Sequence, residues 1–311
     1  WLPLQRLLRP GDFGLCDCMS RGRFASVHRG VLEASGGRPL SPPLAVVVKT
    51  TAEGGAGHRF VDDASAEAVS DLLSEIAVIC RLSHPRIVRF VGACLEADGI
   101  ALVTELEPGG NLHQAVHIQR RELARSERFT LAREVFEALS YLHSRKPPIA
   151  HLDLKSLNLV LDAPGQHLRL CDFGLAREVE EGTTPSRCAG GSPRYMAPEC
   201  HDAELGHATE RADVWSAGCV LIEIFAGLLP YADCSNVHQI LSVMLVHRRG
   251  PAVPRAIEAG VRGAMHCALA FEPGSRLPAQ QILTQLVTLE GRPASGSRLG
   301  EAWGLPCGHV L

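Results

Sequence analysis

Two kinds of hydrophobic pattern follow one another along the chain. In the first third, short apolar runs broken by glycine and proline predict β-strands at 24–31, 44–50, 87–95 and 100–105. The stretch 35–43, rich in glycine and proline, is expected to be the loop between the first two strands. This part of the chain is therefore predicted to be rich in strands.

Helical spacing appears once among these strands and dominates after them. Between residues 62 and 82, apolar side chains recur every three or four positions, which indicates an amphipathic helix. Beyond residue 110 the clearest helices are predicted at 131–143 and 213–226. Residues from about 291 lose this periodicity, so we expect a tail at 291–311.

The longest apolar run, 214–231, does not predict a membrane span. Glu223 and Gly227 interrupt it, which favours a buried helix in a large core. The first residues lack the basic, apolar and small-residue pattern of a secretory signal. Because the chain begins with Trp1 and not Met, we expect a fragment or a processed form.

Composition and charge narrow the class of protein. With 46% hydrophobic and 21% charged residues, the chain is expected to be globular and not disordered. A formal net charge of −3 provides no global attraction to nucleic acid or to an anionic membrane. The length of 311 residues suits two modest domains or one large bilobal domain.

The eleven cysteines are scattered, odd in number and without a Cys-x-x-Cys pair. They are therefore expected to be free thiols in a reducing, cytoplasmic compartment. Cys16 and Cys18 have the wrong spacing for a zinc site.

Three short motifs carry candidate chemistry. They are His-Leu-Asp-Leu-Lys-Ser-Leu-Asn at 151–158, Cys-Asp-Phe-Gly at 171–174 and Tyr-Met-Ala-Pro-Glu at 195–199. Taken singly, Asp153 and Asn158 could be turn or helix-cap residues, and Gly174 could simply supply a positive φ. It is their combination and order that point to one chemistry.

Together, these motifs resemble the catalytic loop, the metal-binding turn and a later segment of eukaryotic protein kinases. The resemblance covers 12–290 and leaves 1–11 as a lead-in. It implies an α+β, bilobal protein-kinase-like fold, with a small antiparallel β lobe containing one helix at about 12–106. A larger, mainly α-helical lobe is implied at about 107–290, with ATP bound between the lobes.

The resemblance also implies which residues contact ATP. The expected nucleotide-binding positions are Ser20, Gly22, Val27, Val47, Lys49, Thr104, Glu105, Leu106 and Val160. Lys49 would hold the α- and β-phosphates, and Glu75 would hold Lys49. A single strand lysine or helix glutamate is usually only a solvated surface charge, but many matches in the same order outweigh that interpretation.

The catalytic and metal-binding roles follow from the same resemblance. Asp153 would accept a hydrogen bond from the acceptor hydroxyl, and Lys155 would steady the γ-phosphate. Asp172 and Asn158 would bind Mg²⁺, a cation that prefers oxygen ligands.

Two further residues are expected to support this machinery. Asp213 would brace the catalytic loop, although it could also be the N-cap of its helix, and Arg276 would pair with Glu199.

The type of kinase is indicated by Lys155, two residues after Asp153, and by the hydroxyl of Ser192. Both are typical of serine/threonine kinases, so the implied partners are proteins with serine or threonine acceptors, and no regulatory partner is indicated. The segments 81–94, 146–149 and 213–216 are similar to the tyrosine-kinase-like group, which includes mixed-lineage and Raf-like kinases.

The chain departs from the kinase pattern in its glycine-rich loop and beside the adenine site. Ser20 and Ala25 replace two loop glycines, and Val47 replaces an alanine that packs on adenine. A non-catalytic pseudokinase that acts as a binding scaffold is therefore the alternative function.

A third departure is Leu152, which stands where an arginine normally clasps an activation-loop phosphate. We therefore expect activity that does not depend on phosphorylation of Thr183, Thr184 or Ser186. Arg177 and Arg187 could replace the missing arginine only in part, because both lie on that loop.

Overall fold

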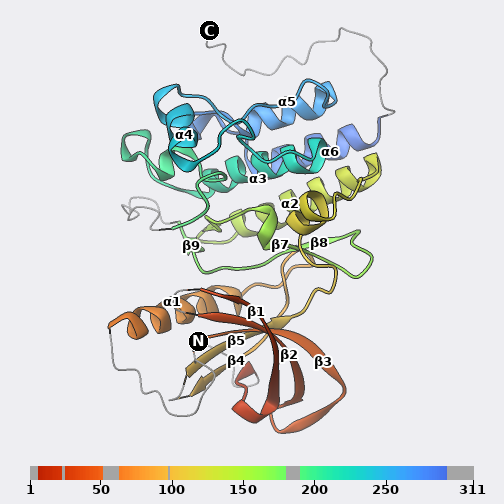
Figure 1. Ribbon diagram of the computed structural model, residues 1–311, viewed down its shortest axis with the longest axis vertical. Coiled ribbons are helices and arrows are strands. Elements are labelled where there is room, and N and C mark those ends of the chain that lie inside the picture. The colour runs from red at the N-terminus through yellow and green to blue at the C-terminus, as the bar shows by residue number, and fades with distance from the viewer. Residues whose placement is uncertain (1–5, 23–24, 52–62, 97–98, 180–189, 293–311) are drawn as a thin grey trace. The chain divides into compact units, whose positions relative to one another are not determined.

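The computed structural model describes residues 6–22, 25–51, 63–96, 99–179 and 190–292 (Figure 1). The chain forms two compact units. Unit 1 comprises Trp1–Pro108 and Cys171–Gly174, and unit 2 comprises Gly109–Leu170 and Leu175–Leu311.

Unit 1 contains a five-stranded antiparallel sheet in the order β1-β2-β3-β5-β4. Its elements are the short helix η2 (Pro10–Asp12), β1 (Phe13–Arg21), β2 (Ser26–Ser35), β3 (Arg38–Thr50), α1 (Asp63–Ile79), β4 (Phe90–Glu96) and β5 (Gly99–Glu105). Strand β1 was not predicted from the sequence. Its residues are mostly exposed, so it lacks the apolar run that marks a strand.

The predicted loop 35–43 is wrong, because β2 and β3 form one long hairpin. Gly36 and Gly37 make its turn with positive φ values of 60° and 76°, which glycine adopts without strain. Residues 38–45 of β3 do not pair with β5, and Pro42 and Pro43 lie between the residues that pair with β2, so neither proline removes a ladder bond.

One core cluster of unit 1 lies on the face of the sheet that carries Val46 and Val48. It comprises Leu8, Leu32, Val46, Val48, Val91, Cys94, Ala101 and Val103. Leu8 belongs to the predicted lead-in, yet its N–H donates to Ala93 O at 2.9 Å. The described end of the lead-in therefore packs against β4.

The predicted amphipathic helix is α1. Leu72, Ile76 and Ile79 are buried, as their spacing predicts, whereas Leu73 is 41% exposed. The helix packs against β5 and carries Glu75 on its buried side.

Unit 2 is mainly helical, with two small antiparallel pairs, β6–β9 and β7–β8. Its longer elements are α2 (Arg125–His143), α3 (Glu210–Ala226), α4 (Val237–Leu241), α5 (Ala259–Ala268) and α6 (Ala279–Glu290). The short strands are β6 (Ile149–Ala150), β7 (Leu159–Leu161), β8 (Leu168–Leu170) and β9 (Arg177–Glu178). The short helices are η3 (Gln114–Ile118), η4 (Ser156–Asn158), η5 (Pro198–Cys200), η6 (Ala203–Leu205), η7 (Ser242–Val246) and η8 (Pro273–Ser275).

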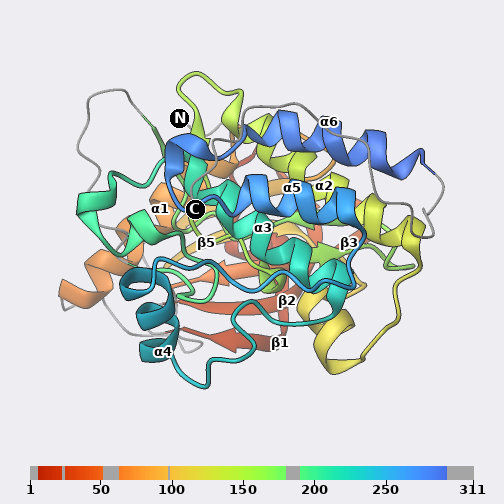
Figure 2. The same cartoon turned by 90° about the horizontal axis from the view of Figure 1, so that it is seen from above.

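Helix α3 forms the centre of unit 2, with α2 and α5 beside it (Figure 2). Every residue from 212 to 224 is buried, which explains why its sequence is apolar on all sides. The Thr209 side chain caps its start by accepting from the Arg211 N–H, and Gly227 ends it with φ 67°. Asp213 is thus not the N-cap, one of the two roles considered for it.

Two expectations about the whole chain can be compared with the described residues. Among them, no helix is long and apolar enough to cross a membrane. The cysteines found there are all free thiols, as expected, whereas Cys188 and Cys307 lie outside the described residues.

Candidate active site

The register of the sheet in unit 1 gathers several predicted nucleotide-binding residues on one face. Val27 pairs with Lys49, and Val47 pairs with Thr104. Since directly paired residues and residues two apart share a face of a sheet, these four side chains share one. The core valines of β3 alternate with Val47 and Lys49 and lie on the opposite face.

Lys49 lies between two carboxylates of unit 1. Its Nζ is 2.7 Å from Glu75 Oε2 and 2.9 Å from Asp172 Oδ1, which confirms the predicted Lys49–Glu75 ion pair. Burial alone would lower the pKa of Lys49, but the two carboxylates outweigh burial and raise the pKa. Lys49 is therefore a permanent cation, and one of its three N–H donors is left for an anionic ligand.

Glu75 links α1 to the Asp-Phe-Gly turn. Its Oε1 accepts from the Phe173 N–H at 3.2 Å, while Oε2 accepts from Lys49. Burial raises the pKa of the Glu75 carboxyl, and Lys49 opposes that rise. The positive φ considered for Gly174 falls instead on Asp172, at 62°. The Asp172 side chain is 41% exposed, so its carboxylate remains accessible to a cation.

The other predicted nucleotide-binding residues of unit 1 are Ser20, Gly22, Glu105 and Leu106, and contacts within the protein involve each of them. Ser20 pairs with Val27, and the Gly22 N–H donates to Ala25 O at 2.8 Å. The Glu105 side chain is bound to Arg89 at 2.7 Å. The Leu106 N–H donates to Ala45 O, so it is already used within the protein.

Unit 2 brings Asp153, Lys155, Asn158 and Ser192 together. Lys155 Nζ lies 2.6 Å from Asp153 Oδ2 and donates to Ser192 Oγ at 3.0 Å. The Ser192 hydroxyl donates to Asp153 Oδ1 at 3.4 Å. Asn158 Nδ2 donates to the Asp153 backbone oxygen at 2.9 Å, which leaves its amide oxygen as the atom able to bind a cation. Val160 is half-buried in the adjoining β7.

Helix α3 holds the catalytic-loop motif through Asp213. The His151 N–H donates to Asp213 Oδ2 at 2.8 Å, and the Leu152 N–H donates to Oδ1 at 2.7 Å. These bonds hold Leu152 at φ 63°, a conformation that a side chain as large as leucine rarely adopts. His143 Nε2 lies 3.0 Å from the same carboxylate. Sequence reasoning missed His143, because nothing local distinguishes it from any other helix histidine.

The predicted pair of Arg276 and Glu199 is present and fully buried. The two guanidinium nitrogens contact the two carboxylate oxygens at 2.6 and 2.7 Å. Arg276 also donates to the backbone oxygens of Ala270, Phe271 and Arg211. The pair therefore joins three segments of unit 2.

Comparison with known proteins identifies the family of the chain. Residues 46–287 match the protein kinase domain family. The chain is 32% identical over 267 residues to the serine/threonine-protein kinase CTR1 of Arabidopsis thaliana, covering 85% of this chain and 30% of that protein. It is 28% identical over 281 residues to the dual specificity protein kinase shkC of Dictyostelium discoideum, covering 90% and 52%.

A third relative is the probable serine/threonine-protein kinase SIS8 of Arabidopsis thaliana, 31% identical over 242 residues, covering 78% of this chain and 23% of that protein. The chain thus spans about a quarter to a half of these relatives' lengths. The family match covers most of the chain and contains every predicted catalytic and metal-binding residue. The chain belongs to the protein kinase domain family.

Proposed function

We propose that this chain is a protein serine/threonine kinase that transfers the γ-phosphoryl group of ATP to protein hydroxyls in the presence of Mg²⁺. The observation that carries the proposal is the arrangement around Asp153, whose carboxylate contacts both the Lys155 ammonium and the Ser192 hydroxyl. A carboxylate that already binds one hydroxyl beside a fixed cation is suited to orient a second hydroxyl next to a phosphate.

Nucleotide binding is supported by the sheet face that carries Val27, Val47 and Lys49. The valines offer an apolar surface to the adenine ring, while Lys49 presents its remaining N–H to phosphate. Glu75 and Asp172 fix the direction of the ammonium before any ligand arrives. Such preorganisation removes the cost of ordering a long side chain on binding.

Asp172 and Asn158 are the residues proposed to hold Mg²⁺. Both offer oxygen atoms, the ligands that Mg²⁺ prefers, and the Asp172 carboxylate is accessible. When bound, Mg²⁺ would neutralise phosphate charge that Lys49 and Lys155 alone leave unpaired.

The metal requirement gives a direct prediction. EDTA in excess is expected to abolish phosphoryl transfer, because Asp172 and Asn158 supply ligands but no cation. Activity is expected to return when Mg²⁺ or Mn²⁺ exceeds the chelator, as measured by incorporation of labelled phosphate. Transfer that continues unchanged in EDTA would contradict the assignment of both residues.

In the proposed step, Asp153 accepts a hydrogen bond from the acceptor hydroxyl and receives its proton. The hydroxyl oxygen forms the new bond to the γ-phosphorus, the bond to the bridging oxygen of ADP breaks, and the proton passes to solvent. Lys155 stabilises the charge on the transferring group. Ser192 orients Asp153 and Lys155 by contacting both.

The experiment that tests the proposal measures ATP-dependent phosphorylation of the chain itself and of a generic protein substrate. Asp153→Asn keeps the shape but removes the charge and is expected to lower the rate by about 100-fold or more. Asp233→Asn is the matched control, because Asp233 is an exposed aspartate of unit 2 that belongs to none of the motifs. Phosphoamino-acid analysis is expected to give phosphoserine and phosphothreonine.

Two results would overturn the proposal. If wild type and Asp153→Asn are equally inactive while both bind ATP or remain folded, the chain is the non-catalytic scaffold considered above. If phosphotyrosine predominates, the chemistry stands but the acceptor specificity inferred from Lys155 and Ser192 is wrong.

A further inference from the structure

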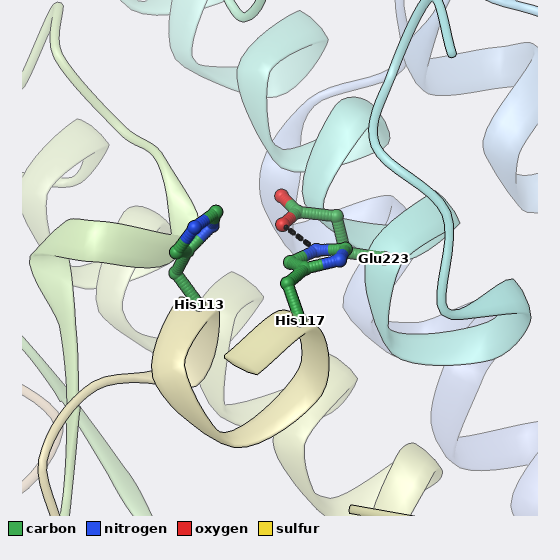
Figure 3. A group of neighbouring side chains, drawn as sticks. All are labelled: His113, His117 and Glu223. Atoms are coloured by element: carbon green, nitrogen blue, oxygen red, sulfur yellow. Dashed lines mark hydrogen bonds and ion pairs between the residues drawn. The ribbon is translucent and has the colours of Figure 1, made fainter. Parts of the chain in front are cut away.

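A second cluster of titratable side chains lies in unit 2 and has no part in the proposed reaction. His113 is the N-cap of η3, His117 lies in the last turn of that helix, and Glu223 faces both from α3 (Figure 3). One potential ligand atom of each residue lies within 4.8 Å of those of the other two. The imidazole rings are 4.9 Å apart between centroids. The sequence shows that the two histidines are four residues apart. Glu223, however, is 106 residues from His117, and in the sequence it only interrupts an apolar run.

The cluster contains polar atoms whose hydrogen-bonding capacity is not used. Glu223 is completely buried, and its Oε1 has no hydrogen-bond partner. The buried Nδ1 of His113 has none either. Buried polar atoms normally find partners, because leaving one unpaired costs roughly 1–3 kcal/mol. Two such atoms in one cluster indicate that a ligand belongs there.

The other carboxylate oxygen of Glu223 is firmly held. Its Oε2 lies 2.7 Å from His117 Nε2 and accepts from Ser156 Oγ at 2.6 Å. Ser156 therefore orients the carboxylate in the way that outer-shell hydroxyls orient metal ligands. A cavity of about 480 Å³ lined by His117 and Glu223 supplies a route for entry.

Two imidazoles and one carboxylate form a ligand set characteristic of zinc sites that keep a fourth position open. A tetrahedral zinc ion with bonds of about 2.0–2.1 Å would place its ligand atoms roughly 3.3 Å apart. Small rotations of three side chains bring atoms within 4.8 Å to that separation. Mg²⁺ does not suit the site, because two of its three ligands are nitrogen.

We propose that His113, His117 and Glu223 form a zinc-binding site, with water or a small anion from the adjoining cavity as the fourth ligand. Zinc would take the place of the contact between His117 Nε2 and Glu223 Oε2, and it would bind His113 Nδ1 and Glu223 Oε1, the two atoms that have no hydrogen-bond partner. Because η3 and α3 then share one metal ion, zinc ties the segment after Gly110 to the central helix of unit 2.

Isothermal titration of the chelator-treated chain with Zn²⁺ tests this proposal. Wild type is expected to bind one equivalent of Zn²⁺. The variants His113→Gln and His117→Gln are expected to bind no Zn²⁺ or to bind it at least tenfold more weakly. His266→Gln is the matched control, since His266 is an exposed histidine on α5. Circular dichroism establishes that each variant is folded. The affinity is expected to fall between pH 7.5 and pH 6, because zinc must displace protons from its ligands.

Cobalt supplies a second measurement that needs no variant. Co²⁺ bound by nitrogen and oxygen is expected to give visible absorption bands without the near-ultraviolet charge-transfer band of a thiolate ligand. A thiolate band would assign the metal to cysteines and overturn the proposal. So would a wild-type chain that takes up no zinc, or folded His113→Gln and His117→Gln variants that keep the whole equivalent.

Discussion

At the scale of single residues, Lys49 shows how a charge is prepared for a ligand. Val46 and Val48 face the core of unit 1. Because side chains alternate along a strand, Lys49 points to the opposite face of the sheet. There it meets Glu75 and Asp172, whose negative charges compensate for its burial. An ammonium paired in this way is held in place without being neutralised by loss of its proton.

Replacing this charge is expected to remove activity. Lys49→Met keeps the length and apolar stem of the side chain but leaves Glu75 and any bound phosphate without a cation. We expect the rate of phosphoryl transfer to fall by about 100-fold or more, comparable to the loss of a preorganised electrostatic contact. Lys146→Met, at an exposed position of unit 2, is the matched control. Unchanged activity in Lys49→Met would remove the central assignment of unit 1.

At the scale of elements, the segment 151–158 owes its shape to α3. Asp213 binds two successive N–H groups and maintains the unusual backbone of Leu152. The Leu152 side chain is 8% exposed, so an apolar group is buried where an arginine would carry charge. The segment 151–158 is thus held by a carboxylate within unit 2.

This arrangement underlies the prediction about regulation. The triple variant Thr183→Ala, Thr184→Ala, Ser186→Ala, at positions outside the described residues, is expected to keep the rate of phosphatase-treated wild type. A phosphate on any of these side chains would not meet the guanidinium that usually binds it, because position 152 is leucine. Arg177 lies in β9, on the same loop as the three positions. Steady-state kinetics of the two proteins provide the test. A tenfold or larger fall, equivalent to about 1.4 kcal/mol of barrier, would show that phosphorylation controls the enzyme after all.

At the scale of the whole molecule, stability depends on contacts that connect distant parts of the chain. Unit 2 joins residues 77 positions apart through the Arg276–Glu199 pair, both of whose side chains are fully buried. The same unit has an exposed counterpart, Arg248 and Glu272, at 2.6 Å. Each arginine also lies over an aromatic ring, Trp215 and Phe271 respectively. The two pairs therefore differ in burial, and Arg276 also binds a second carboxylate oxygen and three backbone oxygens.

This difference predicts very different costs of substitution. Arg276→Met is expected to lower the free energy of unfolding by about 3–5 kcal/mol, because it leaves a buried carboxylate uncompensated. Arg248→Met is expected to cost about 1 kcal/mol or less, because water and salt screen the exposed pair. Urea unfolding followed by circular dichroism measures both. Equal costs would mean that burial does not determine the contribution of the Arg276 pair.

Elements of the fold could be predicted from the sequence when their pattern lies within the element itself. The apolar spacing of α1 and α3 is repeated within each helix, so both were found from sequence alone. Strand β1 and the outer part of the β2–β3 hairpin, predicted as the loop 35–43, were missed, because exposed residues and prolines are tolerated only at particular edges. Which strand lies at the edge of a sheet is decided only when the strands pair, so it cannot be predicted from local sequence.

The same distinction separates the two sites. The sequence by itself was enough to predict the roles of Lys49, Asp153 and Asp172, since each lies in a short motif whose neighbours identify it. Only the tertiary structure decided that Glu223, buried in α3, meets His113 and His117 from a segment more than 100 residues away. The physical reason is that a motif records which atoms are close along the backbone. Packing alone brings together groups that the backbone keeps far apart.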